Sequence, residues 1–133
     1  MQLKVVTLLL APCFALATPK FGTLKSTMKE MNTRVKTVAQ QIDNSSLDTQ
    51  SAALSDEVVQ LADDSARFVP DIIAQAPPSD RAGMTEQYKK MLNQTHQLAA
   101  DLAKAIRSGN KSAAKDLLKQ LNENKKDGHT DFK

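Results

Sequence analysis

The sequence predicts an all-α domain that folds as an antiparallel, up-down-up-down four-helix bundle. Its composition favours helices, because the chain is rich in Ala, Leu, Lys and Gln and holds only four glycines and 4% aromatic residues. Apolar residues recur at alternating spacings of three and four, which places them on one stripe of a helix. The segments between these stripes are short, near residues 44–46, 77–83 and 109–112, and short connections favour antiparallel neighbours.

Residues 1–17 have the pattern of a secretory signal peptide. Lys4 gives a positively charged start, residues 5–14 form a largely apolar run, and the segment ends in a small-residue cleavage site, Ala-Leu-Ala. We expect cleavage before Thr18, which leaves residues 18–133 as one exported domain. Neither this run nor any later stretch reaches the roughly twenty apolar residues of a membrane helix, so no membrane insertion is expected.

Cys13 is the only cysteine of the sequence and falls within this signal. A lipid anchor on Cys13 is the alternative, because residues 10–13 have the spacing of a lipoprotein box, although a proline directly before the cysteine fits that motif poorly. Without the signal the chain has no cysteine, which excludes disulfides, thiolate zinc sites and a cysteine nucleophile.

The first two helices follow from their apolar stripes. The first is expected to begin after Thr23, a residue type that favours the N-cap position. Its stripe consists of Leu24, Met28, Met31, Val35, Val38 and Ile42. The second helix is expected from about Ser46 to a point before Pro77. Its stripe consists of Leu54, Val58, Leu61, Ser65, Phe68 and Ile72. Pro70 lies inside this helix and should kink or break it, because proline removes a backbone donor and crowds the preceding turn.

The last two helices are predicted in the same way. The third follows the connection at residues 77–83 and ends at Gly109, which provides a stop signal. Its stripe consists of Met84, Tyr88, Met91, Thr95, Leu98 and Leu102. The fourth helix runs toward the C-terminus. Its stripe consists of Ala114, Leu117, Leu118, Leu121, Lys125, His129 and Phe132.

The charged residues are mixed along every segment, and the formal net charge is +3. The absence of a basic cluster argues against nucleic acid and against an anionic membrane surface as partners. Acidic pairs such as Asp63 and Asp64 are expected on solvated faces. His96 has no carboxylate neighbour in the sequence, and we expect it at the solvent or at the rim of the core. No catalytic constellation emerges, so the chain is not predicted to be an enzyme.

Met28 near the start of the first helix and His129 near the end of the last could meet in space. In an up-down-up-down bundle these two positions lie at the same end, where a methionine and a histidine could hold a haem. The crossing between the second and third helices should bring further residues to that end: Pro77, Pro78, Tyr88 and Leu92. Two alternatives stay open at this point, that Met28 is core filler and that His129 is a surface residue on a frayed turn.

Several short motifs resemble those of the cytochrome b562 family across residues 18–133. They are Met28-Lys29-Glu30-Met31-Asn32, the pair Pro77-Pro78, the link at Gly109, and the stretch from Leu118 through His129 to Lys133. The resemblance implies a monomeric periplasmic electron carrier with one non-covalent haem b and redox partner proteins that the sequence does not identify. It implies Met28 and His129 as axial ligands of the iron. It also implies a haem-lining role for Pro77, Pro78, Tyr88, Leu92 and Met31, and it places Lys125 where the family has an arginine near the haem edge.

The residues just before His129 bear on the haem-binding hypothesis. The chain lacks the Cys-x-x-Cys-His motif of the related cytochromes c′, so any haem must be b-type. Gly128 directly precedes His129, and a glycine inside a helix costs roughly 1 kcal/mol, which could loosen the turn that aims His129. The alternative is a haem-free periplasmic bundle that binds a protein partner or copper(I). Its soft donors would be Met28, Met31, Met84, Met91, His96 and His129.

Overall fold

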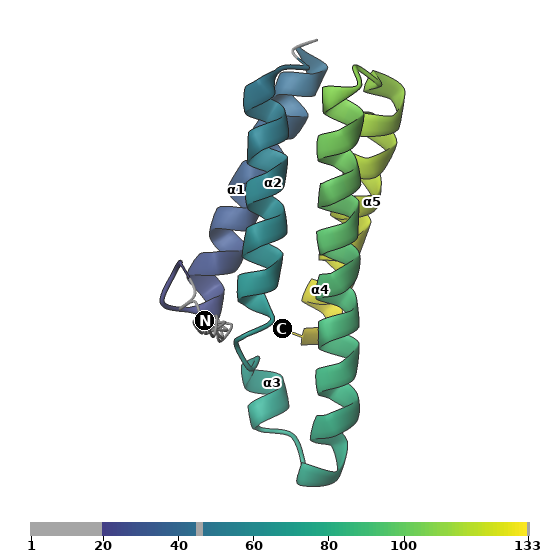
Figure 1. The fold of residues 1–133 in the computed structure, drawn as a ribbon. Helices are drawn as coiled ribbons and strands as arrows, with labels where there is room; N and C mark the ends of the chain where they lie inside the picture. Colours follow the sequence, from purple (N-terminus) through teal and green to yellow (C-terminus); the bar gives the residue numbers. More distant parts are fainter. Residues whose placement is uncertain (1–19, 45–46, 133) are drawn as a thin grey trace, which may run out of the picture.

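The computed structural model describes residues 20–44 and 47–132, and within these residues every regular element is an α-helix. The helices in chain order are α1 (Leu24–Asp43), α2 (Thr49–Ser65), α3 (Asp71–Ala74), α4 (Pro78–Arg107) and α5 (Lys111–Phe132). Figure 1 shows the four long helices side by side, with α3 as a short turn below α2. The predicted all-α four-helix bundle is therefore confirmed. The predicted signal peptide and its cleavage point lie outside the described residues.

The four long helices do not pack equally against one another. Helix α2 packs extensively against both α1 and α4, and α4 packs against α5, whereas the contact between α1 and α5 is much smaller. The first and last helices therefore form an open seam. This seam matters for the site, because the predicted ligands come from these two helices.

The core is divided between the body of the bundle and its lower end. The main cluster includes Val38, Ile42, Ala99 and Ala114, each with no exposed surface. A smaller cluster at the lower end is formed by Ile73, Tyr88 and Leu92. Met28 packs against both clusters and so lies at their junction.

The start of α1 agrees with the sequence pattern. The Thr23 side chain accepts a hydrogen bond from the backbone N–H of Ser26 at 3.1 Å, as an N-cap does. This cap fixes the first turns of α1, in which Met28 lies. Along the predicted stripe, Met31, Val35, Val38 and Ile42 are buried, while Leu24 and Met28 are partly buried.

The break predicted at Pro70 is confirmed. Helix α2 ends at Ser65 and α3 begins at Asp71, so the intervening residues are not helical. The expectation that Ile72 continues the core stripe is wrong: its side chain is 37% exposed, and Ile73 is 2% exposed in its place. The reason is that a helical stripe keeps its phase only while the helix is continuous.

The boundaries of α4 also differ from the expected ones. The predicted connection from Pro77 to about Gly83 is too long, because α4 already begins at Pro78. Proline suits the first position of a helix, where its missing N–H is not needed. The end of α4 is as predicted: Gly109 has φ 71°, a left-handed conformation that favours glycine.

Candidate cofactor site

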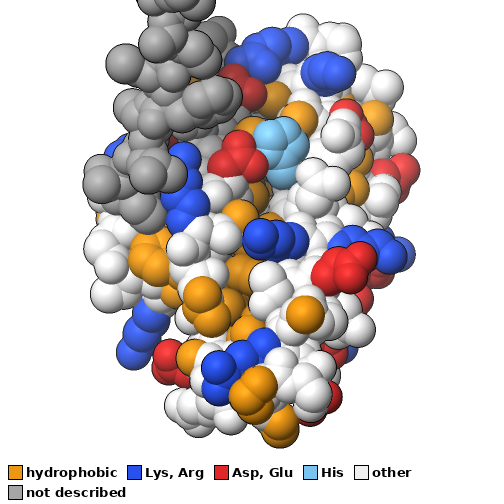
Figure 2. All heavy atoms as spheres, turned by 60° about the horizontal axis from the view of Figure 1, so that its bottom comes forward, with side chains coloured by type: hydrophobic (Ala, Val, Ile, Leu, Met, Phe, Trp, Pro, Cys, Tyr) orange, Lys and Arg blue, Asp and Glu red, His pale blue; other side chains and the backbone are white. Residues whose placement is uncertain are grey.

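A cavity of about 880 Å³ opens at the lower end of the bundle. It lies along the seam between α1 and α5, with α4 and the broken segment around Pro70 completing its wall. Figure 2 turns this end toward the viewer and shows hydrophobic side chains at the surface, interspersed with lysine and arginine side chains. The volume falls within the range of pockets that hold small molecules and cofactors.

Met28 and His129 both line this cavity. Met28 projects from the second turn of α1 and is partly buried, while His129 belongs to the last turn of α5 and is exposed. Within residues 20–44 and 47–132, no hydrogen bond or ion pair engages the imidazole of His129, so both ring nitrogens are available to a ligand or metal. The structure thus brings the two residues together as the bundle topology predicts, and their role as iron ligands stays a prediction.

The other predicted site residues divide into two groups. Met31, Tyr88, Leu92 and Lys125 line the cavity. Pro77 and Pro78 are not among the described residues that line it. They form the start of α4, and Tyr88 follows Pro78 by ten residues, or about 15 Å along the helix axis.

A different proline contributes to the wall in their place. Pro70 lines the cavity together with its neighbours Val69, Asp71 and Ile72. Val69 is 65% exposed and Ile72 is 37% exposed, and these are the two large hydrophobic side chains most open to solvent in the described part of the chain. The sequence predicts the break at Pro70, but it gives no signal that the broken segment covers the site.

Tyr88 connects the broken segment to the end of α5. Its hydroxyl donates a hydrogen bond to the backbone carbonyl of Ser65 at 2.7 Å, and burial raises the pKa of Tyr88 to about 12. Its ring meets the ring of Phe132 edge-on, with centroids 5.3 Å apart and an interplanar angle of 66°. Because Phe132 lies three residues after His129, this contact holds the turn that carries His129 against α4.

Gly128 allows α4 and α5 to approach closely at the cavity. A Cβ atom at this position would lie only 2.3 Å from the Met91 sulfur, which also lines the cavity. The lack of a side chain therefore makes room for the Met91 thioether. Helix α5 continues through Gly128 to Phe132, so the glycine does not interrupt the helix.

Two polar contacts tie α5 to its neighbours beside the cavity. The Thr95 hydroxyl bonds the side-chain oxygen of Asn124, which links α4 to α5. The Lys125 ammonium donates to the side-chain oxygen of Asn32, which links α5 to α1 across the open seam. The seam is thus bridged by a polar contact one turn before His129.

The soft donors considered for copper(I) are only partly gathered at this site. Met28, Met31, Met91 and His129 line the cavity. Met84 and His96 do not. His96 Nδ1 lies 2.7 Å from the Asp63 carboxylate on α2, a carboxylate partner that the sequence did not reveal because the two residues are far apart along the chain.

The described residues were also searched for clusters of metal-binding side chains and for membrane-spanning helices. No group of three or more His, Cys, Asp or Glu side chains in residues 20–44 and 47–132 is arranged to hold a metal ion. None of the helices in these same ranges combines the length and the apolar character that crossing a bilayer requires.

Comparison with known proteins identifies the family. The family model of cytochrome b562 matches residues 23–133, which is most of the chain. Searches of curated proteins and of solved structures gave no significant match. The chain therefore belongs to the cytochrome b562 family, whose members are four-helix bundles that bind a b-type haem non-covalently and carry electrons. The family and the cofactor predicted from the sequence are confirmed.

Proposed function

We propose that this cytochrome b562 family protein is a periplasmic electron carrier that holds its haem between Met28 and His129. The single observation that carries the proposal is that these two residues, from opposite ends of the chain, line one cavity. A thioether and an imidazole are both established axial donors to haem iron. The rest of the lining is largely apolar, as a porphyrin ring requires, and the cavity has the volume of a cofactor pocket.

Bound haem supplies one-electron exchange between the ferrous and ferric states of its iron. Met28 would hold the iron through its thioether, a soft donor that favours the ferrous state, and His129 would hold it through an imidazole nitrogen. This pair is expected to raise the reduction potential relative to harder ligand sets. With Met28 and His129 both holding the iron, the haem would supply electron exchange and would offer no free coordination site to oxygen or peroxide. The ligand set therefore supports a carrier and not an enzyme.

The surrounding side chains have separate roles in this proposal. Tyr88 and Leu92 present a buried apolar wall from α4, which keeps water away from the ring. Phe132 holds the last turn of α5 through its contact with Tyr88, so that His129 keeps its direction. Export to the periplasm is supported by the signal-peptide pattern of residues 1–17 and by the family, whose members are periplasmic.

The test is a haemin titration of the mature protein, residues 18–133, with visible spectra of the oxidised and reduced forms. Met28→Ala and His129→Ala are compared with Met84→Ala and His96→Ala, which remove the same residue types outside the cavity. We expect a sharp low-spin ferrous spectrum with one equivalent bound, degraded only by the first two substitutions. A spectrum of loosely held haem that neither substitution changes would contradict the ligand assignment and favour the haem-free, copper(I)-binding alternative.

A further inference from the structure

We propose that Lys25, Lys29 and Lys125 form a cationic rim on this cavity that binds the two propionate carboxylates of the cofactor. This inference rests on the proposed function, because it assumes that haem occupies the cavity. It assigns a role to three residues of this chain that the ligand assignment does not use.

The three lysines stand beside the two proposed axial ligands. Lys25 and Lys29 lie one turn apart on α1 on either side of Met28, and Lys125 lies one turn before His129 on α5. All three line the cavity, and all three are exposed at its mouth. Each ligand-bearing helix therefore brings at least one ammonium group to the edge of the site.

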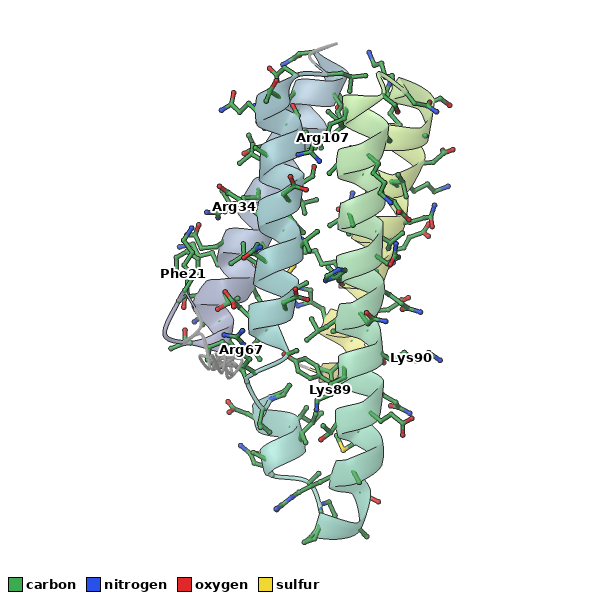
Figure 3. All side chains as sticks on the ribbon, in the orientation of Figure 1. Phe21, Arg34, Arg67, Lys89, Lys90 and Arg107 are labelled. Atoms are coloured by element: carbon green, nitrogen blue, oxygen red, sulfur yellow. The ribbon has the colours of Figure 1, made fainter. Side chains whose placement is uncertain are left out.

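These lysines differ from Arg34 and Arg107, which both pair with carboxylates. Arg34 pairs with Glu30 and Glu57 at 2.6 and 2.5 Å, and Arg107 pairs with Asp56 at 2.5 Å. Figure 3 labels both arginines above the lower end of the bundle, and neither of them lines the cavity. Among the described residues, no carboxylate forms an ion pair with any of the three rim lysines.

The contact that one of these lysines does make leaves it free to bind an anion. The Lys125 ammonium donates one hydrogen bond to the Asn32 amide oxygen, and an ammonium group carries three donors. Asp71 is the one acidic side chain among the described residues that line the cavity. The three lysines therefore outnumber the one carboxylate among the described residues that line the cavity.

This arrangement fits a particular kind of ligand. An apolar cavity with a cationic rim suits a flat apolar molecule that carries carboxylates on one edge, which is the chemistry of haem. The lysines are exposed and well hydrated, so each contact is modest. From the usual strength of exposed ion pairs we expect each lysine to change affinity about two- to fivefold, and the three together about tenfold or more.

The test compares haemin with haemin dimethyl ester, which has the same iron porphyrin but neutral side chains. The wild type is titrated beside Lys25→Gln/Lys29→Gln/Lys125→Gln and a control with Lys36→Gln/Lys90→Gln/Lys104→Gln. The control lysines do not line the cavity, and Lys90 projects away from the bundle in Figure 3. Circular dichroism and thermal unfolding of the apo proteins show whether each variant folds. A single charge reversal, Lys29→Glu, is titrated in parallel.

We expect the wild type and the control to prefer haemin over its diester about tenfold or more, and the rim variant to lose most of that preference. Lys29→Glu should weaken haemin binding and leave diester binding unchanged. The preference should also fall as salt rises, because the rim is exposed. An unchanged preference in the rim variant would overturn the rim while leaving the haem site intact. Failure of the wild type to bind either porphyrin would overturn the haem site itself, and the rim with it.

Discussion

The hydroxyl of Tyr88 donates a 2.7 Å hydrogen bond to the carbonyl of Ser65, the residue at which α2 ends. This bond joins the middle of α4 to the start of the break that leads to Pro70. Because the ring of Tyr88 also packs on Phe132, one side chain links the broken segment of the wall to the turn that carries His129. The broken helix and the proposed ligand are therefore parts of one connected structure.

Tyr88→Phe should lower the free energy of unfolding of the apo protein by about 1 kcal/mol. The effect is modest because the N–H of Phe68 also donates to the Ser65 carbonyl, at 3.2 Å, so the acceptor keeps one partner. Urea unfolding followed by circular dichroism measures the change. Thr33→Ala removes an exposed hydroxyl that bonds its own helix and serves as the control. Equal losses in the two variants would argue against a special role for the Tyr88 bond.

The same tyrosine should make stability depend on pH in the alkaline range. Burial raises the pKa of Tyr88 to about 12, whereas a tyrosine in the unfolded chain titrates near 10. Between these values the unfolded state has lost the proton that the native state still holds, so stability falls as pH rises from about 10 to about 12. Below pH 10 both states are protonated and Tyr88 contributes no pH dependence.

The chain holds a single tyrosine, so this titration can be followed directly. The near-ultraviolet absorbance of tyrosinate should report an apparent pKa well above 10 in the folded apo protein and near 10 in urea. Tyr88→Phe should lack this component of the alkaline loss of stability. A native titration near 10 would show that the hydroxyl is accessible to water.

The sequence predicts the helices better than it predicts the wall of the site. Apolar periodicity locates α1 and α5 and hence brings Met28 and His129 to one end, because the topology of a bundle follows from its helix count and its short connections. Apolar periodicity does not predict which of Ile72 and Ile73 is buried. The helix is interrupted at Pro70, and the direction of the side chains after the break depends on the backbone path of the intervening residues. The contributions of Val69 and Pro70 to the wall depend on that same path.

The sequence also misjudges the two prolines at the start of α4 and the glycine before His129. The helix crossing and the family resemblance both place Pro77 and Pro78 at the site, but α4 begins at Pro78, and the residues that line the cavity from α4 start at Tyr88. Gly128 looks like a weakness in the sequence because helix propensity is a local property. The glycine leaves space for the Met91 sulfur on the neighbouring helix, and this contact appears only when α4 and α5 are packed together.

Phe132→Ala should weaken haem binding although both proposed ligands are present. Loss of the contact with Tyr88 removes an aromatic pair near the end of α5, and the last turn of a helix frays when it is not held. We expect haemin affinity to fall about tenfold and the high-spin fraction of the ferric spectrum to rise. Phe132→Leu should restore part of both. A low-spin spectrum unchanged in Phe132→Ala would mean that His129 is held by α5 alone.

Gly128→Ala should lower the affinity for haemin without lowering the stability of the apo protein. Alanine favours a helix over glycine by about 1 kcal/mol, yet the new Cβ would lie 2.3 Å from the Met91 sulfur and must displace that flexible side chain into the cavity. We therefore expect the apo protein to keep or gain stability while haemin affinity falls several-fold.

Gly83→Ala is the matched control, because Gly83 lies in α4 with no atom within 4 Å of the new Cβ, and it should gain stability without changing affinity. Adding Met91→Ala to Gly128→Ala removes the clash, so the double variant should bind haemin no worse than Met91→Ala alone. If Gly128→Ala instead lowers affinity equally with and without Met91, the glycine would act through the direction of His129 and not through the space that it leaves for the thioether.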